Sequence, residues 1–241
     1  MRPAVLRWVP MVGSTQDAVH QLAEEGAPEG TALAALEQTA GRGSRGREWS
    51  SGAGGLWMSV LLRPVSLAGV ETLSLRVGLE VVRVLESLGG HGLMLKWPND
   101  VMAGARKAGG ILCEGRWSGD RPAWVVVGVG LNVTNTVPPD LALRATRLAD
   151  HGIGLGAEAL APVIGEAVLA AGLQAGPLDA AERGALAAHD WLRGRELAEP
   201  VAGIADGILA DGALRVRTAG GDISLVRAGP IEPAAPVSLA E

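Results

Sequence analysis

Both lysines of this chain lie in one short stretch, eleven positions apart. Lys96 begins the run KWPND at residues 96–100, and Lys107 follows that run, whereas the other 19 basic residues are arginines. A lysine in a tight site differs from an arginine, because its ammonium is a compact point charge that can stay close to an oxygen as that oxygen moves during a reaction. Asn99 and Asp100 add amide and carboxylate oxygens that could bind a ligand or a metal ion. The simpler alternative is a turn between two strands with incidental lysines.

A second candidate is the glycine- and arginine-rich segment GRGSRGR at residues 41–47. It satisfies the dinucleotide pattern G-x-G-x-x-G, but that pattern requires a helix to begin at its third glycine. The following residues, 48–55 (EWSSGAGG), are a poor helix start. A solvated basic loop remains an alternative. We favour a mobile loop whose backbone N–H groups and guanidinium groups wrap a phosphate or an acyl phosphate.

The third candidate is a strongly apolar strand interrupted by Gly128 and Gly130 and followed by Asn132. Glycine inside a strand lowers stability, so such positions suit a place where a ligand approaches the backbone closely. The Asn132 amide could bind a base or a hydroxyl group. Strand glycines also mark ordinary β-bulges, so this segment alone is a weak indication.

Apolar periodicity predicts the elements that must position these segments. Helices are predicted at residues 14–26, 71–88 and, as a pair, within 156–192. Strands are predicted at 31–38, 56–63, 109–116 and 123–133, with a short strand that ends in the run KWPND, residues 96–100. Ser14 is expected to cap the first helix. Pro64 is expected to end the strand at residues 56–63. From Arg195 onwards, Asp206-Gly207, Asp211-Gly212 and Gly220-Gly221 indicate hairpin turns in a small β-domain.

Composition excludes several classes of protein. The 241 residues, 48% of them hydrophobic, suffice for one sizeable domain and a small one. A single cysteine, Cys113, excludes a disulfide framework and a Cys-rich zinc site. The net charge of -5 argues against broad nucleic-acid binding. The N-terminus lacks the apolar region of a signal peptide, and the apolar stretch 157–175 carries two glutamates, so we expect a soluble, cytoplasmic protein.

Taken together, the segments resemble the biotin–protein ligase (biotin–[acetyl-CoA-carboxylase] ligase) family. The resemblance runs from Gly13 into the C-terminal domain and rests on the order and spacing of five motifs. These motifs are Ser14-Thr15 and residues 38–49, 96–100, 106–112 and 128–132. The resemblance implies an α/β (α+β) fold with a class II synthetase-like mixed sheet, flanking helices and a small C-terminal SH3-like β-barrel. It divides the chain into a catalytic domain, residues 1–193, and a C-terminal domain, residues 194–241.

The resemblance also implies an activity. Such ligases use Mg²⁺ and ATP to activate biotin to biotinyl-5′-AMP, then transfer biotin to one lysine of a biotin carboxyl carrier protein domain of a carboxylase. Lys107, Arg42 and Arg47 match the family's catalytic residues. Lys107 would bridge the biotin carboxylate and the α-phosphate, countering the charge that builds as they join. Asp100 is assigned either to the metal or to the acceptor lysine, two roles that the motif does not separate.

The other site residues are carried over by motif. The biotin-binding residues implied are Ser14, Thr15, Gln38, Gly41, Arg42, Lys107, Gly110 and Gly128. The ATP- or adenylate-binding residues implied are Arg42, Arg45, Arg47, Trp49, Asn132 and Lys107. The loop from Val133 to Arg147 is expected to close over the adenine, and Arg227 to reach ATP.

The chain departs from the family pattern at two positions. Gln16 stands where members commonly have asparagine. Ser44 stands where many members have an arginine that helps to retain the intermediate, which suggests looser retention and some proximity-driven labelling. The twelve residues before Gly13 are too few for the DNA-binding domain of some members, so we expect no repressor function and no DNA partner. Homodimers that extend the sheet occur in the family, which leaves a homodimer open.

Three other functions are alternatives to this one. A lipoate–protein ligase-type acyl-adenylate transferase shares the fold and the adenylate chemistry, but the 41–47 loop and the 96–100 run favour biotin. A non-catalytic biotin-binding protein on the same fold predicts that Lys107→Ala changes no turnover. A nicotinamide-dependent oxidoreductase fails because the required helix is missing after residue 46 and no acid or base for hydride transfer is evident.

Overall fold

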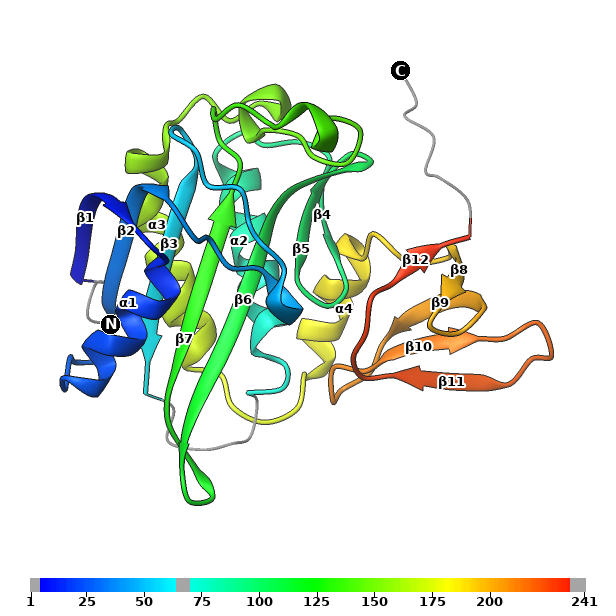
Figure 1. Ribbon diagram of the computed structural model, residues 1–241. Coiled ribbons are helices and arrows are strands. Elements are labelled where there is room, and N and C mark those ends of the chain that lie inside the picture. The colour runs from blue at the N-terminus through cyan, green and yellow to red at the C-terminus, as the bar shows by residue number, and fades with distance from the viewer. Residues whose placement is uncertain (1–4, 64–69, 235–241) are drawn as a thin grey trace.

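The computed structural model describes residues 5–63 and 70–234, and these residues form a mixed sheet with a smaller sheet beside it (Figure 1). The larger sheet has seven strands within this described part, in the order β1-β2-β3-β7-β6-β5-β4. β1 and β2 are parallel, and the other neighbours are antiparallel. Its strands are β1 Val5–Val12, β2 Thr31–Gln38, β3 Leu56–Leu62, β4 Leu93–Lys96, β5 Asp100–Ala103, β6 Arg106–Ser118 and β7 Arg121–Leu131.

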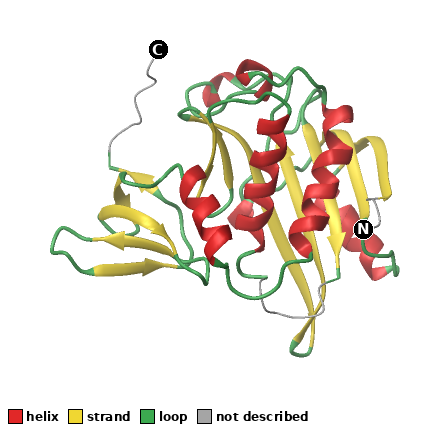
Figure 2. Ribbon diagram, turned by 180° about the vertical axis from the view of Figure 1, so that it is seen from behind, coloured by secondary structure: helices red, strands yellow, loops and turns green. Residues whose placement is uncertain are grey.

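Helices cover both faces of this sheet. The described chain has four α-helices: α1 Thr15–Glu24, α2 Leu73–Ser87, α3 Ala157–Gly172 and α4 Ala180–His189. α1 packs on β2, β3 and β7 at the front in Figure 1, and the view from behind in Figure 2 shows helices on the opposite face. The mixed sheet with flanking helices confirms the fold class expected from the sequence.

The alternation of side chains along β7 determines where a ligand can approach. Val125, Val127 and Val129 point into the main core with α2 and α3, whereas Val126 points the other way, into a small core with α1. Because side chains alternate along a strand, Gly128 and Gly130 share the face of Val126. The same alternation places Gly110 and Glu114 of β6 on that face, opposite Ile111 and Cys113. The sheet therefore presents a glycine-lined surface beyond the part that α1 covers.

The described residues after Arg195 form a second, antiparallel sheet in the order β11-β10-β9-β8-β12. Its strands are β8 Glu196–Glu199, β9 Gly203–Ile208, β10 Leu214–Arg217, β11 Ile223–Val226 and β12 Glu232–Pro233. Leu197, Leu214 and Val216 share a buried cluster with Leu79 of α2 and Trp97. This small β unit was expected. The division into domains at residues 193 and 194 stays a prediction.

Some expectations about elements were incomplete or wrong. β1 and β5 were not predicted, and β6 begins at Arg106 rather than at residue 109. Asp206-Gly207 is not a turn, because it lies inside β9, where the pairing with β10 is irregular. Pro64, the expected end of a strand, lies outside the described residues. Within the described ranges, none of the helices is both long enough and apolar enough to cross a membrane.

Candidate active site

A cavity of about 310 Å³ opens on the glycine-lined face of the sheet, a volume typical of small-molecule sites. Its floor comes from β3, β6 and β7, and its walls come from the start of α1, the 41–49 loop and the loop after β7. Predicted residues that line it are Ser14, Thr15, Gln38, Arg42, Arg47, Trp49, Lys107, Gly110, Gly128 and Asn132. The fold thus brings together segments spread over more than a hundred positions of the chain.

Polar side chains at the start of α1 form one end of the cavity. Thr15 donates from its backbone N–H to Gln38 Oε1 at 2.8 Å, and its hydroxyl lies 2.9 Å from Ser59 Oγ. Gln38 in turn donates from Nε2 to Ser51 Oγ at 2.8 Å. Ser14 occupies the N-cap position of α1, but its buried hydroxyl makes no hydrogen bond to any described residue, so the expected side-chain cap is wrong. A buried hydroxyl without a partner is unfavourable, which suits a position that meets a ligand.

Gln16, one of the two departures from the family pattern, lies against Gly128. Its Nε2 donates to Val126 O at 3.1 Å, and its Oε1 accepts from Ser59 Oγ at 3.1 Å. A Cβ added at Gly128 would lie 2.7 Å from Gln16 Oε1. Gly128 therefore makes room for the longer glutamine side chain.

The 41–49 segment forms a short hairpin beside the cavity. Arg42 pairs with Glu48, Gly43 N donates to Arg47 O at 2.7 Å, and Trp49 N donates to Gly41 O at 2.9 Å. A Cβ at Gly41 would lie 2.3 Å from Trp49 O, so this position requires glycine. A single 3-10 turn, Ser44–Gly46, forms the tip, and residues 47–55, all described, form no helix. The rejection of the dinucleotide interpretation is therefore supported.

Trp49 and Lys107 lie together over the glycines of β6 and β7. A Cβ at Gly130 would lie 2.9 Å from Trp49 Nε1, and one at Gly110 would lie 3.4 Å from both Lys107 Nζ and the Trp49 ring. Lys107 Nζ lies 4.8 Å from the Trp49 ring centroid and forms an ion pair with Asp100 at 2.6 Å. Trp49 Nε1 is buried and finds no acceptor among the described residues.

The three arginines of the loop have different surroundings. The guanidinium of Arg42 bonds to the carboxylates of Asp17 and Glu114. Arg47 donates to Ser44, from NH2 to Oγ at 3.0 Å and from Nε to the carbonyl at 3.3 Å. Arg45 lies exposed at the tip, in the left-handed region with φ 61°, and does not line the cavity. The structure brings Arg42 and Arg47 to the cavity edge and leaves Arg45 outside it.

The loop after β7 covers the side of the cavity next to Lys107. Lys107 N donates to Arg144 O at 2.8 Å, and Thr146 N donates to Lys107 O at 3.0 Å. Asn132 Oδ1 accepts from Asn135 Nδ2 at 3.2 Å, and both amides are buried at the wall. Part of residues 133–147 therefore forms a wall of the cavity, and the closure of this loop over the adenine stays a prediction. Arg227 instead pairs with Asp211 at 2.6 Å and does not line the cavity.

Sequence reasoning missed Asn135 and Arg144, which also line the cavity. A usable signal was present for the first, because all three asparagines of the chain, Asn99, Asn132 and Asn135, line the site. Asn99 does so while bonding to β6, with Nδ2 donating to Ile111 O at 2.7 Å. No comparable signal distinguished Arg144 from the other arginines.

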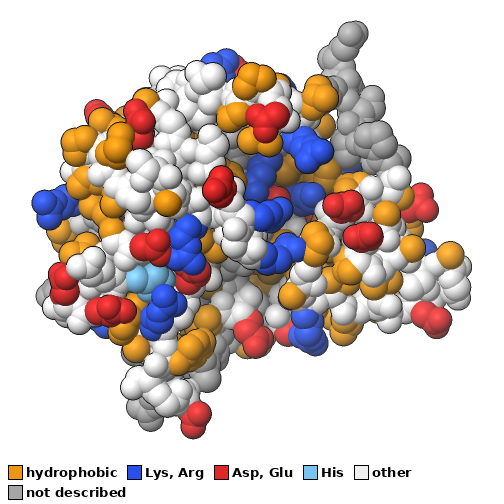
Figure 3. Space-filling model, in the orientation of Figure 1, with side chains coloured by type: hydrophobic (Ala, Val, Ile, Leu, Met, Phe, Trp, Pro, Cys, Tyr) orange, Lys and Arg blue, Asp and Glu red, His pale blue; other side chains and the backbone are white. Residues whose placement is uncertain are grey.

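Positive charge gathers at this site. Figure 3 shows Lys and Arg side chains in and around the hollow between the body and the smaller sheet. Lys96 lies near this region with Nζ 5.5 Å from the Trp191 ring centroid, and burial lowers its pKa. Among the described residues, no three His, Cys, Asp or Glu side chains gather as a metal site. The arrangement suits an anionic ligand next to an apolar floor.

Comparisons with known proteins identify the family of this chain. The model of the biotin/lipoate A/B protein ligase family matches residues 8–132, more than half of the chain. The bifunctional ligase/repressor BirA of Bacillus subtilis is 41% identical over 144 residues, which cover 58% of this chain and 44% of that protein. The biotin–[acetyl-CoA-carboxylase] ligase of Mycobacterium tuberculosis is 39% identical over 152 residues, covering 60% of this chain and 55% of that protein. The matched part thus spans about half the length of these curated relatives.

Solved structures extend the likeness to nearly the whole chain. A biotin protein ligase from Aquifex aeolicus, in complex with biotin and ATP, has a TM-score of 0.79 and 30% identity, covering 95% of this chain and 97% of that one. A biotin protein ligase from Leishmania major, in complex with biotinyl-5-AMP, has a TM-score of 0.65 and 25% identity over 94% of this chain. The family match and the fold together show that this chain belongs to the biotin/lipoate A/B protein ligase family.

Proposed function

We propose that this chain is a biotin–[acetyl-CoA-carboxylase] ligase. It activates biotin with ATP to biotinyl-5′-AMP and transfers biotin to a specific lysine of a biotin carboxyl carrier protein. The observation that carries the proposal is the cavity in which Lys107 and Trp49 lie over glycines of β6 and β7. The A. aeolicus relative, solved with biotin and ATP, supports the choice of substrates.

The polar end of the cavity suits a ureido group on an apolar ring. The side chains of Ser14, Thr15 and Gln38 supply hydroxyl and amide groups, and the glycines let the backbone approach the ring. The buried hydroxyl of Ser14, which lacks a hydrogen-bond partner within the described residues, gains one when such a ligand binds. Gly41, Gly110 and Gly128 complete the proposed biotin contacts.

In the first step, a carboxylate oxygen of biotin attacks the α-phosphorus of ATP, the bond to the bridging oxygen breaks, and pyrophosphate leaves. Lys107 lies at the cavity and can bind the carboxylate and the α-phosphoryl oxygens as charge builds there. Arg47 of the loop is the second cation in reach of the phosphates, and Trp49 and Asn132 contact the adenylate. In this arrangement Lys107 exchanges its bond with Asp100 for one with the substrate.

In the second step, the amine of the carrier lysine attacks the acyl carbon, the bond to the phosphate oxygen breaks, and AMP leaves while the nitrogen loses a proton. Asp100 is the carboxylate nearest to Lys107, 2.6 Å away, so it can hold the incoming ammonium. Its other proposed role is with Mg²⁺, which proteins often bind through one or two carboxylates together with substrate phosphates. Bound Mg²⁺ would neutralise phosphate charge.

Several expectations about partners and location stay predictions. We propose that the chain acts in the cytoplasm without DNA or a membrane as partner, since its net charge of -5 disfavours both polyanionic surfaces. A homodimer stays open. The lipoate-type transferase and the non-catalytic biotin-binding protein remain the alternatives that the test below distinguishes.

The test is a reaction of the purified protein with biotin, MgATP and a carrier domain, followed by intact-mass and peptide analysis of the carrier. The expected result is a gain of one biotinyl group on a single carrier lysine, together with pyrophosphate release. Pyrophosphate release with lipoate but not with biotin would favour the lipoate-type enzyme. Biotin binding without pyrophosphate release would favour a non-catalytic protein.

A further inference from the structure

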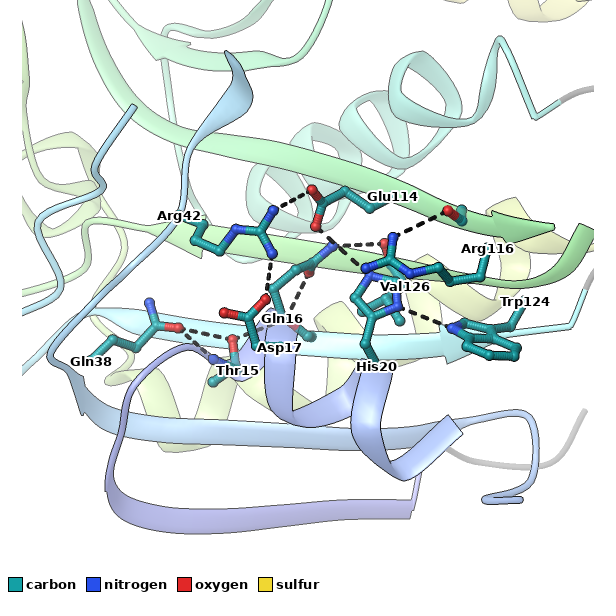
Figure 4. Close-up of polar contacts among 12 residues, drawn as sticks. Thr15, Gln16, Asp17, His20, Gln38, Arg42, Glu114, Arg116, Trp124 and Val126 are labelled. Carbon is teal, nitrogen blue, oxygen red and sulfur yellow. Dashed lines mark hydrogen bonds and ion pairs between the residues drawn. The ribbon is translucent and has the colours of Figure 1, made fainter. Parts of the chain in front are cut away.

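The Arg42 side chain reaches out of the cavity to two carboxylates on different elements (Figure 4). One terminal nitrogen donates to Asp17 in the first turn of α1, directly after the cavity residues Thr15 and Gln16. The other donates at 2.6 Å to Glu114 of β6, which shares a face with Gly110. Each carboxylate therefore belongs to an element that builds the cavity, and Arg42 links both to the loop.

The bonds of Arg42 to Asp17 and Glu114 connect the 41–49 loop to the rest of the protein through a side chain. Of residues 42–48, all of which the structure describes, Arg42 alone has a side-chain hydrogen bond to a residue outside the loop. Arg47 bonds only to Ser44. The pairing of Arg42 with Glu48 joins the two arms of the hairpin, and the second arm continues into Trp49. Holding Arg42 thus holds the arm that presents Trp49 to Lys107.

The surroundings of Glu114 keep its charge available for Arg42. Trp124 Nε1 donates to His20 Nδ1 at 3.0 Å, and because an indole nitrogen can only donate, Nδ1 must be the acceptor. The proton of the neutral ring therefore lies on Nε2, 3.8 Å from Glu114 Oε2, which is too far for a hydrogen bond. Burial and the nearby Arg116 lower the pKa of His20, so the ring tends to stay neutral. Arg42 is then the cation that directly pairs with Glu114.

We propose that Asp17 and Glu114 are positioning residues that clamp Arg42 and so hold residues 41–49 in place, with Trp49 over Gly110 and Gly130. This clamp acts from outside the cavity and gives Arg42 a role other than the substrate contact implied by the family resemblance. What the positioned loop then does rests on the proposed function, because the loop lies where biotin and ATP would meet.

An opposite role for the carboxylates is that they store Arg42 outside the site until it swings onto a substrate. The two roles predict effects of opposite sign. Removal of a clamp loosens the loop and raises the KM for biotin. Removal of a storage site frees Arg42 and lowers that KM or leaves it unchanged.

The first test uses the free protein and trypsin, which cleaves after Arg45 and Arg47 in the loop. Asp17→Asn and Glu114→Gln should each speed cleavage at these sites, by about fivefold for the less exposed Glu114. Neither substitution should add to the effect of Arg42→Ala, because both act through that side chain. Glu80→Gln, which removes an exposed carboxylate paired with Arg83 on α2, is the control and should leave cleavage unchanged.

Loop cleavage at the wild-type rate in both Asp17→Asn and Glu114→Gln overturns the clamp. Since the Asp17 side chain is 61% exposed, Asp17→Asn keeps the test valid if Glu114→Gln lowers overall stability. No substrate is needed, so this result stands even if the protein proves not to be a ligase.

The second test measures turnover with biotin, MgATP and a carrier domain. Glu114→Gln should raise the KM for biotin about fivefold while kcat changes less than about twofold, and Asp17→Glu, which keeps the charge, should behave like wild type. A KM at or below the wild-type value in Glu114→Gln overturns the clamp in favour of storage. Absence of turnover in the wild type counts against the proposed function and leaves the trypsin result to decide the clamp.

Discussion

Buried polar groups are hydrogen-bonded around Arg76 on α2, whereas two of them lack hydrogen-bond partners near Trp49 at the cavity. Arg76 is buried, and its guanidinium donates to both carboxylate oxygens of Glu182, at 2.6 and 3.1 Å, and to Thr72 Oγ1 at 2.8 Å. It also donates to the carbonyls of Gly176 and Pro177. At the cavity, the buried Ser14 hydroxyl and the Trp49 indole N–H have no partner among the described residues.

The difference indicates that the contacts of Arg76 serve stability and that the cavity groups are available for binding. A satisfied network such as that of Arg76 joins α2 to the start of α4, and its hydrogen bonds lower the pKa of Glu182. Groups left without partners lower the stability of the free protein and gain partners when a ligand arrives. Changes at the two places should therefore separate activity from stability.

The largest expected effect belongs to Lys107 at the cavity. Lys107→Ala should slow the formation of biotinyl-5′-AMP about 100-fold or more, because the ammonium stabilises charge that develops in the transition state. The stability of the variant should change little, since the ion pair with Asp100 is partly exposed. The measurement is single-turnover formation of biotinyl-5′-AMP. Arg106→Ala, the adjacent cation, is the matched control, and equal losses in the two variants would contradict the assigned role.

The opposite result is expected at Arg76. Arg76→Met should lower the free energy of unfolding by about 3 kcal/mol, because it leaves the Glu182 carboxylate without its buried partner. Activity per folded molecule should stay at the wild-type level. Arg83→Met, on the same helix but in an exposed pair with Glu80, should change the free energy of unfolding by less than about 0.5 kcal/mol. Urea unfolding curves measure the free energy of unfolding of both variants. Similar losses in the two would contradict the special role of the Arg76 network in stability.

The sequence alone predicted which residues line the cavity better than it predicted the ion pairs that the charged residues make. The glycines of β7 do mark positions where side chains approach the backbone closely, those of Gln16 and Trp49, whereas the approach of a ligand there stays a prediction. The partners of Arg42 were not predictable, since Asp17, Glu114 and Arg42 are far apart in the chain and meet only once β2, β6 and α1 have packed. Arg144 was missed for a similar reason, because its loop reaches the cavity through backbone bonds to Lys107.

The fold shows the same division between local and long-range signals. The long helix α2 and the buried strands β2 and β3 were predicted nearly to their ends, because their apolar patterns are strong. The run KWPND was expected at the end of a short strand, but that strand ends at Lys96, and Asp100 begins β5, a four-residue strand too short to give a pattern. Trp97 of that run donates to Gly212 O in the smaller sheet at 2.8 Å, a contact that no local pattern encodes.

A smaller effect is expected from the protonation of two histidines that do not line the cavity. The pKa values of His20 and His151 are lowered from 6.5, chiefly by burial. At a pH between the lowered value and 6.5, the unfolded chain binds more protons than the folded protein, so the free energy of unfolding falls on acidification through this range. The loss begins near pH 6.5 and is complete below the lowered pKa. Glu182 contributes separately, below its ordinary value of 4.5.

Urea unfolding of the wild type and of His20→Gln, from about pH 7.5 to about pH 5, measures this effect. The glutamine amide oxygen can still accept from Trp124, so the variant removes the titration and keeps the hydrogen bond. The pH dependence should be weaker in His20→Gln than in the wild type. If the free energy of unfolding depends on pH equally in the two proteins, His20 does not contribute to the pH dependence.

The smallest change concerns Ser44, at the tip of the same hairpin. Ser44 Oγ accepts from Arg47 Nη2 at 3.0 Å, so this position contributes a neutral hydroxyl where the family resemblance implies a further arginine. Ser44→Arg should slow the escape of biotinyl-5′-AMP and lower biotinylation of bystander proteins by about threefold. Ser118→Arg, at the exposed end of β6, adds the same charge away from the cavity and should leave labelling unchanged. Because both variants raise the net charge equally, a matching decline in the two would assign the effect to overall electrostatics, whereas a decline confined to Ser44→Arg would show that the loop's local charge controls retention.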